Sequence, residues 1–326
     1  MLSKLVEEFN GLSPSRQALL VAAGVGTVAV GAVGAYQIKK RIENTPPKIW
    51  RRAGEINEIY VFPIKSCAPI RISRVNCSDL GPQRNMLRDR IFMVTNLEGK
   101  WVTARQKSKM VLIQPQFDDG FRQMTLSAPG MDDITIQIGR LFEQQSIKGV
   151  VWGETVPTVD CGDEVAKWLS TYLLEKPEGY RLMFYPLDKT SRKKSDEDTG
   201  ALQDETSYML FNTATVEDLN TRLDEKVSVL QFRPNFVVKG PPAYAEDDWR
   251  WVKIGSTVFK YVKPCLRCVF TNIDPQKGTS SVEGQPLKTL KSYRRKPEFG
   301  ESPAFGIHLG LRIPGDVSLG DPVYYG

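Results

Sequence analysis

Hydrophobic positions in this chain follow two patterns: one unbroken apolar run near the N-terminus and many short runs after it. Residues 18–36 carry no charge. At ~1.5 Å rise per residue, about 19 residues are enough to span the hydrocarbon core of a bilayer as a helix. We therefore predict a transmembrane signal anchor over residues 18–38, preceded by a short segment at 1–17.

The charges around this run favour an anchor over a cleaved signal peptide. The run is longer than the apolar part of a typical signal peptide, and its N-terminal side is only weakly basic. The strongest positive cluster follows the run, at Lys39, Lys40, Arg41, Arg51 and Arg52. By the positive-inside rule, a basic linker at 39–54 keeps the bulk of the chain on the cytosolic side.

Beyond the linker, short β-branched and aromatic runs alternate with Gly, Asn, Asp and Pro, which is typical of strands and turns. Such runs occupy residues 55–64, 70–77, 90–96, 100–106, 110–117, 123–128, 134–138, 180–186, 207–212, 232–238, 251–264 and 315–326. A hairpin turn is expected at 96–100, and apolar residues at helical spacing predict helices over 163–174 and 215–223. Many strands and few helices indicate an α+β protein built around β-barrels.

Length and composition add limits to this picture. With 326 residues, the chain can form two modest domains, which we place at 55–180 and 181–326. The net charge of +6 is mild and partly local to the linker. No stripe of Lys and Arg interleaved with aromatics occurs elsewhere, so we expect no nucleic-acid partner. There is also no G-x-G-x-x-G after a strand, which leaves a Rossmann or P-loop fold without support.

The five cysteines are odd in number and irregularly spaced, which argues for a reduced, cytosol-facing compartment. Two of them form the C-x-x-C of the stretch KPCLRC, Cys265 and Cys268. Zinc is disfavoured because the only histidine, His308, lies 40 residues further on. A redox dithiol, a thiolate metal ligand favoured by Lys263 and Arg267, and two inert buried cysteines all stay open from the residues alone.

Three further segments combine basic and small polar residues at strand ends: PIKSCAP, LRDR and FRPNF. Their candidate side chains are Lys65, Ser66, Arg88, Arg90, Arg233 and Asn235. Such donors suit a bound phosphate or pyrophosphate. Each segment alone is more typical of a surface ion pair or turn, so the set matters only if the fold brings it beside Cys268. Without a G-x-S-x-G elbow, His308 is more typical of a structural residue than of a hydrolase triad.

Together, these segments resemble the mitochondrial amidoxime-reducing components, a family of MOSC molybdoenzymes. The resemblance spans almost the whole chain and rests on the anchor and on VFPIKSC, LRDRIFMVTN, VTARQ, FRPNFVV, YAEDDW, KPCLRC, DPQKG, LKTLKSYRR and GDPVYYG. It implies an N-terminal MOSC-type β-barrel domain followed by a MOSC β-barrel domain.

The resemblance also implies a molybdenum cofactor, Mo-molybdopterin, with Cys268 as the metal ligand and catalytic residue. Implied cofactor contacts fall on Lys65, Ser66, Arg90, Thr206, Ser207, Arg233, Asn235, Arg267 and His308. Two positions depart from the family pattern. Leu266 stands where relatives carry a small polar residue, and His308 stands where they carry a tyrosine, which makes His308 a candidate for the active site.

The activity that the resemblance implies is two-electron reduction of N-hydroxylated compounds such as amidoximes. The implied electron donors are cytochrome b5 and NADH-cytochrome b5 reductase, and the implied location is the outer mitochondrial membrane, with one span and a cytosolic catalytic part. An association of the family domain with pyridoxal phosphate is also implied.

Two alternatives keep the fold and change the function. A sulfur carrier would hold a persulfide on Cys268, although a pyridoxal-phosphate desulfurase domain would be expected beside it. A non-enzymatic membrane adaptor would need neither cysteine.

Overall fold

The computed structural model describes residue 13, residues 44–193 and residues 198–326. The chain divides into two compact units, Met1–Lys48 and Ile49–Gly326, and everything below concerns the second unit. The anchor expected at 18–38 lies outside the described residues. Within the described residues, no helix has both the length and the apolar character that a membrane crossing requires.

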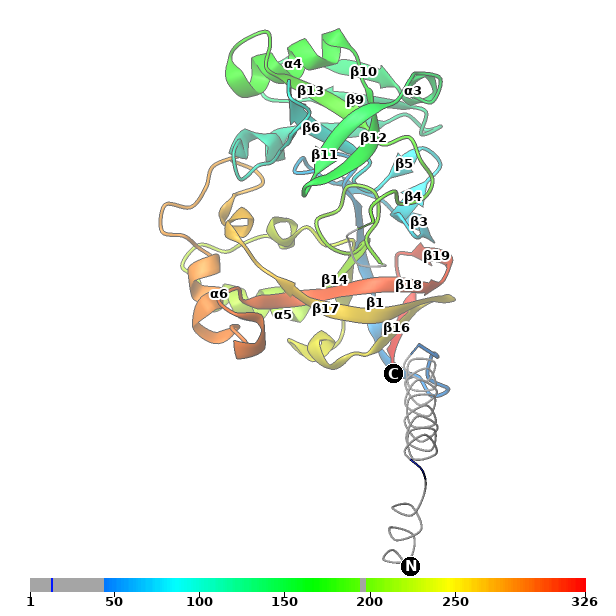
Figure 1. The fold of residues 1–326 in the computed structure, drawn as a ribbon. Coiled ribbons are helices and arrows are strands. Elements are labelled where there is room, and N and C mark those ends of the chain that lie inside the picture. The colour runs from blue at the N-terminus through cyan, green and yellow to red at the C-terminus, as the bar shows by residue number, and fades with distance from the viewer. Residues whose placement is uncertain (1–12, 14–43, 194–197) are drawn as a thin grey trace, which may run out of the picture. The chain divides into compact units, whose positions relative to one another are not determined.

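A closed β-barrel forms the C-terminal half of the second unit (Figure 1). Its seven strands run in the order β15 (Phe236–Lys239), β14 (Tyr208–Asn212), β18 (Ala304–Ile313), β17 (Thr257–Leu266), β16 (Trp251–Ile254), β20 (Pro322–Tyr325) and β1 (Arg51–Val61). The ring closes because β1 also pairs with β15. The expected C-terminal barrel is confirmed, and its last strand comes from far upstream in the sequence.

The N-terminal half is built on a five-stranded sheet, β11 (Ile147–Val151), β12 (Glu154–Asp160), β13 (Tyr180–Phe184), β6 (Phe92–Asn96) and β7 (Trp101–Val102). A parallel bridge between Lys100 and Val150 joins its two edges. Beside it lies a sheet of β10 (Ile134–Gln137), β9 (Gln123–Ser127) and β8 (Gln114–Phe117).

A four-stranded sheet ties the two halves together. It consists of β19 (Gly315–Ser318), β3 (Arg74–Ser78), β4 (Gly81–Arg84) and β5 (Leu87–Arg88). The short β2 (Ile70–Arg71) pairs antiparallel with the end of β1. β19, from near the C-terminus, pairs with β3 of the N-terminal half. Conversely, β1 from the N-terminal side completes the C-terminal barrel.

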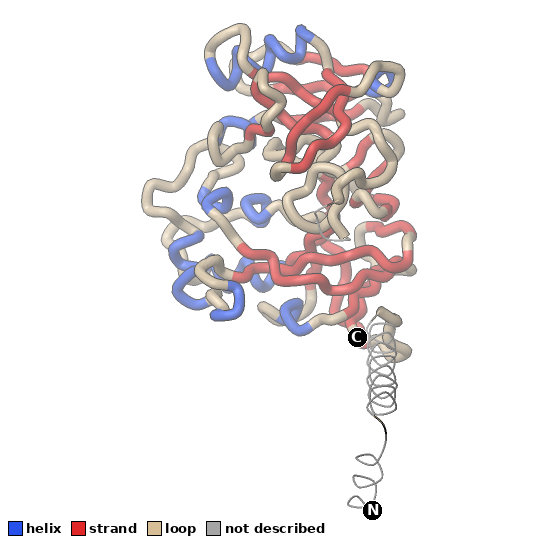
Figure 2. Tube along the Cα trace, in the orientation of Figure 1, coloured by secondary structure: helices blue, strands red, loops and turns tan. Residues whose placement is uncertain are grey.

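The helices are short pieces between strands and loops (Figure 2). They are α3 (Ile138–Leu141), α4 (Asp163–Leu174), α5 (Thr213–Asn220) and α6 (Leu287–Tyr293), with 3-10 turns η1 (Ser108–Leu112), η2 (Val229–Phe232), η3 (Ala245–Asp248), η4 (Val269–Asn272) and η5 (Pro297–Phe299). The helix expected at 163–174 is confirmed as α4, which packs on β13.

Several strand expectations are wrong in part. Residues 110–112 belong to η1, only Trp101–Val102 of 100–106 is a strand, and the strand expected at 232–238 begins at Phe236. The segment VFTNID after Cys268 has the β-branched and aromatic composition of a strand, but it forms η4. In η4 the backbone N–H and the hydroxyl of Thr271 both donate to the Cys268 carbonyl, at 3.1 and 2.9 Å. These local bonds draw the backbone into a turn despite its β-branched and aromatic composition.

Each half has its own apolar core. Phe92, Phe184 and Tyr185 are buried in the N-terminal core, and Tyr208, Phe236 and Phe259 pack inside the barrel. The chain therefore builds two separate cores, and residues from both halves meet between them.

Candidate functional site

One cavity of about 270 Å³ collects most of the residues expected to bind the cofactor. Its walls include Lys65, Ser66, Arg90, Thr206, Arg233, Asn235, Arg267, Cys268 and His308. Lys65 and Ser66 come from the loop between β1 and β2, and Arg90 from the loop between β5 and β6. The others come from the barrel strands and their connections. The fold thus joins three strand-end segments that are far apart in the sequence.

Ser207 is the one expected contact that does not line this cavity. Its side chain is buried, and its hydroxyl is directed at the carbonyl oxygens of Asp79 and Asp198, at 2.6 and 3.1 Å. These bonds to the backbone indicate a structural role for Ser207, beside the cavity and not in its wall.

The two cysteines of KPCLRC occupy different environments. Cys268 is exposed in the cavity wall and stands at the N-cap of η4. Cys265 is buried beside Met209 and Phe211, and burial raises the pKa of its thiol. Of the two, only Cys268 presents its thiol to solvent, as a metal or substrate would require.

Arg267, between them, is a buried cation. Its Nε donates to the Phe305 carbonyl at 2.7 Å and its Nη1 to the Phe232 carbonyl at 2.9 Å. No carboxylate forms an ion pair with it among residues 44–193 and 198–326, and burial lowers its pKa. The Arg267 guanidinium therefore places a positive charge in the cavity wall next to Cys268.

Arg90 and Arg233 form a second cationic wall. Their guanidinium carbons lie 4.6 and 4.1 Å from the centre of the Phe62 ring. Arg90 pairs with Asp89 and also donates to the Arg233 carbonyl at 3.2 Å, while Arg233 donates to the Cys67 carbonyl at 2.7 Å. Burial and the nearby charge of Arg90 lower the pKa of Arg233 to about 9.

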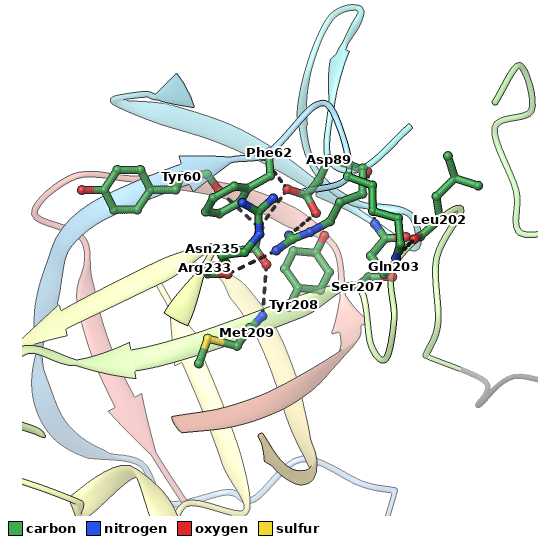
Figure 3. A network of polar contacts seen from close by, with 12 residues as sticks. Tyr60, Phe62, Asp89, Leu202, Gln203, Ser207, Tyr208, Met209, Arg233 and Asn235 are labelled. Atoms are coloured by element: carbon green, nitrogen blue, oxygen red, sulfur yellow. Dashed lines mark hydrogen bonds and ion pairs between the residues drawn. The ribbon is translucent and has the colours of Figure 1, made fainter. Parts of the chain in front are cut away.

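A buried network fixes this wall (Figure 3). The Asp89 carboxylate accepts from the Phe62 backbone N–H at 2.8 Å and from the Asn235 amide at 3.1 Å. Asn235 in turn accepts from the Met209 N–H at 3.1 Å. Asp89 is fully buried, and through these bonds it joins the segment before β6 to the end of β1 and to Asn235 of the cavity wall.

Lys65 lies on the same side of the cavity. Its ammonium donates to the Leu202 carbonyl at 2.8 Å and pairs with Asp204. Burial lowers the pKa of Lys65, and the Asp204 carboxylate acts against that shift.

His308 is held as a neutral ring. Thr206 donates its only hydroxyl proton to the Tyr208 carbonyl at 2.8 Å, so His308 Nδ1, 3.0 Å from that hydroxyl, is the donor. Burial and the charges of Arg267 and Lys263 lower the pKa of His308 to about 3. Near neutral pH the cavity therefore meets an uncharged imidazole whose Nε2 carries no proton.

Backbone strain is concentrated here. Four of the eight non-glycine residues with positive φ in the described part of the chain line the cavity: Ser66 (71°), Arg90 (47°), Trp152 (51°) and Arg233 (55°). Such conformations cost about 1–3 kcal/mol each and persist where the surrounding structure demands them. The strained backbone around this cavity therefore indicates a functional site.

Comparison with known proteins identifies the family. The chain matches the MOSC N-terminal beta barrel domain over residues 53–176 and the MOSC domain over residues 197–324. It is 34% identical to mitochondrial amidoxime-reducing component 1 of Homo sapiens, over 99% of this chain and 97% of that protein.

A second relative has the same relation to the chain. Mitochondrial amidoxime reducing component 2 of Rattus norvegicus is 33% identical, over 94% of this chain and 92% of its own length. This chain belongs to the mitochondrial amidoxime-reducing component family. The resemblance carried by the sequence motifs is confirmed.

The resemblance implies a molybdenum cofactor, a pterin with a phosphate and a thiolate-bound metal, and the cavity can be tested against that expectation. Two residues of the cavity wall each have a buried atom without a hydrogen-bond partner within the described residues: the Nη2 of Arg233 and the Oε1 of Gln203. An unpaired guanidinium N–H suits a phosphate oxygen, and an unpaired amide oxygen suits a ring N–H. Together with the exposed Cys268 thiol, these atoms fit such a cofactor.

Several cavity residues escaped the sequence analysis. They include Thr103, Arg105, Trp152, Gln203, Asp204, Glu205, Gln231 and Phe270. Most lie in loops with no motif of their own. Trp152 alone carries a local signal, because it occupies a tight turn where Asn or Gly is usual.

Proposed function

We propose that this protein is a molybdenum-cofactor-dependent reductase of N-hydroxylated compounds. The observation that carries the proposal is one cavity in which an exposed thiol, Cys268, lies among buried or half-buried cations. One of those cations, Arg233, keeps an N–H without a partner within the described residues. A thiolate suits a soft, high-valent metal, and clustered cations suit a phosphorylated pterin.

Each part of the chain has a role in this function. Arg90, Arg233 and Lys65 bind the anionic part of the cofactor, with Ser66 and Asn235 beside them, and Cys268 is the metal ligand. When bound, the cofactor supplies two-electron redox chemistry at molybdenum. His308 and Thr206 contribute neutral hydrogen-bonding groups, so the positive charge of the site comes from Lys and Arg.

The overall reaction balances with NADH as reductant. An amidoxime takes up two electrons and two protons, its N–O bond breaks, and an amidine and water leave. NADH and one proton supply this reducing power and give NAD⁺. The substrates are small N-hydroxylated molecules.

Metal analysis tests the proposal directly. We expect about one molybdenum per chain in the purified protein, and a loss of at least tenfold in Cys268→Ser. Cys265→Ser is the matched control and should retain the metal, because the Cys265 thiol is buried in apolar contacts. Equal loss in both variants would contradict the ligand assignment, and sulfane sulfur without molybdenum would indicate the sulfur carrier.

The electron donor that we propose is cytochrome b5, reduced by its NADH-dependent reductase. Exposed Lys288 and Lys291 of α6, together with exposed Arg295 just beyond its C-terminal end, line a surface pocket with Asn272. The Asn272 side chain accepts from the Leu287 N–H at 3.0 Å, so α6 is tied to η4, which starts directly after Cys268. An acidic partner docked there would lie close to the metal ligand.

Salt dependence tests this docking. Steering between opposite charges weakens as ions screen them, so electron transfer should slow steeply as ionic strength rises. Charge reversal at Lys288 and Lys291 should reduce the association rate at least tenfold at low salt. Reversal of two exposed lysines in the N-terminal half, Lys148 and Lys167, is the control. A rate that does not depend on salt would exclude this docking mode.

We further propose that the protein resides in the outer mitochondrial membrane, held by the predicted anchor at 18–38 with the catalytic part in the cytosol. The basic linker and the mitochondrial naming of the relatives support this location. Protease treatment of intact mitochondria should remove the catalytic part; its survival would place the protein elsewhere.

A further inference from the structure

The hairpin between β11 and β12 has an unusual residue at its tip. Val151 pairs with Glu154, which leaves a two-residue turn of Trp152 and Gly153. Both residues have positive φ, 51° and 76°, the combination that a type I′ turn requires. Asn and Gly adopt this conformation readily, whereas a bulky aromatic residue is strained there. Local preference therefore does not explain Trp152.

Tertiary contacts hold this side chain in place. The Trp152 indole N–H donates to Asp204 at 3.0 Å, and its ring centre lies 4.8 Å from that of Trp101. The guanidinium of Arg105 lies 5.5 Å from the Trp152 ring and 5.4 Å from the Trp101 ring. These contacts fix the ring, yet Trp152 is still 48% exposed and lines the cavity.

The surroundings of Trp152 indicate what it can bind. Leu266, 41% exposed, and the half-buried Phe270 line the same cavity and add apolar surface. Arg105 is exposed and forms no ion pair within the described part of the chain. The solvent edge of the cavity thus combines a fixed flat ring, apolar side chains and a guanidinium that forms no ion pair, although its charge acts on the Asp204 carboxylate, which already pairs with Lys65.

We propose that Trp152 and Arg105 form a substrate subsite for planar, conjugated N-hydroxylated compounds that carry a carboxylate or phosphate. The substrate ring stacks on Trp152, and its anionic group pairs with Arg105. This inference rests on the proposed reductase function and adds a preference among its substrates. Stacking on a fixed indole costs little conformational freedom, so strain at the turn is repaid by a preorganised binding surface.

Three substrates and two variants test the subsite in the molybdenum-loaded protein. The substrates are an aryl amidoxime, the same compound with a para-carboxylate, and an aliphatic amidoxime of similar length. Trp152→Asn places the preferred Asn-Gly pair in the turn, so the hairpin keeps its geometry while the ring is removed. Arg105→Gln removes the charge and keeps much of the side-chain length.

We expect Trp152→Asn to raise KM about tenfold for both aryl substrates, with kcat and the aliphatic KM changed less than twofold. Arg105→Gln should raise KM about fivefold for the carboxylated substrate alone. The midpoint of thermal unfolding should not fall in Trp152→Asn, which separates a binding role from a structural one. The matched controls are Phe142→Leu, at an exposed aromatic that does not line the cavity, and Arg84→Gln, at an exposed arginine that does not line it either.

The outcomes separate the two proposals. Equal losses on aryl and aliphatic substrates, or unchanged KM values for all three, would overturn the subsite while reductase activity stands. Absence of activity towards all three substrates in molybdenum-loaded wild-type protein would overturn the proposed function itself. The product amidines, titrated calorimetrically, should show the same order of affinities as the KM values and do not depend on turnover.

Discussion

At the scale of single residues, the cavity contains two cations, Arg233 and Arg267, that form no ion pair with a carboxylate among the described residues. Arg267 bonds only to carbonyl oxygens and a methionine sulfur, and Arg233 bonds to the Cys67 carbonyl while its Nη2 has no partner in the described chain. Burying a cation without compensation costs several kcal/mol, so such groups persist where an anion completes the site. The unpaired cations of this cavity therefore indicate an anionic ligand.

His308 allows a residue-level test because it is the only histidine in the chain. Burial and nearby cations lower its pKa to about 3, so the folded protein should take up no proton there between pH 8 and 5. We expect the imidazole resonances in an NMR titration to stay constant over this range, with the proton on Nδ1. A midpoint near pH 6.5 would contradict the buried, neutral ring.

The same shift has a defined effect on stability. The unfolded chain protonates His308 near its ordinary pKa of about 6.5 and the folded chain does not, so stability from this group is present above pH 6.5 and is lost as pH falls. Between pH 7.5 and 5.5 the loss should be about 1.4 kcal/mol in wild type and absent in His308→Gln. The difference in urea unfolding between the two proteins measures it.

The residue motifs predicted most of the cavity but not its rim. Lys65, Arg90, Arg233 and Arg267 lie in short segments whose composition already suits an anion, and all four reach the cavity. Ser207 directly follows Thr206, yet its hydroxyl donates to backbone carbonyls outside the cavity, those of Asp79 and Asp198. Rim residues such as Trp152 come from loops, where only the fold decides which side chains meet.

At the scale of elements, a buried carboxyl joins η3 to α5. Glu246 is fully buried, and its Oε1 accepts from the Thr215 hydroxyl at 2.8 Å. Its Oε2 has no partner among the described residues. Burial raises the pKa of Glu246, so this junction is under electrostatic strain near neutral pH.

Glu246→Gln should relieve this strain. A carboxyl with a raised pKa keeps its proton better in the folded state, so the wild type loses stability as pH rises above the ordinary value of about 4.3. The variant should be more stable by about 1–2 kcal/mol at pH 7, and this gain should vanish near pH 4. Urea unfolding at both pH values measures it, with exposed Glu217→Gln on α5 as control. A gain independent of pH would contradict a charged Glu246.

Element type was predictable where the periodic signal was long. The amphipathic pattern of α4 gave both of its ends, because Val165, Trp168, Leu169 and Tyr172 all face the core. Short elements failed for the opposite reason. In η4, two hydrogen bonds to the Cys268 carbonyl determine the backbone conformation. Such local bonds do not produce a periodic pattern of apolar residues in the sequence.

At the scale of the whole molecule, the barrel depends on a strand from the other end of the chain. β1 pairs with β20 on one side and β15 on the other, and Ile56 and Ile59 from it are buried in the barrel core. Strand composition indicated a barrel but could not reveal this closure, because pairing between distant segments has no local signal. Without β1, both neighbouring strands would have open edges.

This dependence leads to a test of foldability. The segment 181–326 contains six of the seven barrel strands but lacks β1, and it also lacks β3, the partner of β19. We expect it to show no cooperative urea transition by tryptophan fluorescence, whereas residues 49–326 unfold in a single one. Adding a peptide of residues 49–63 should restore partial cooperativity, because it supplies β1, and a scrambled peptide should not. A cooperative transition of 181–326 alone would mean that the ring tolerates a gap, and that β1 serves mainly to bring Lys65 and Arg90 to the cavity.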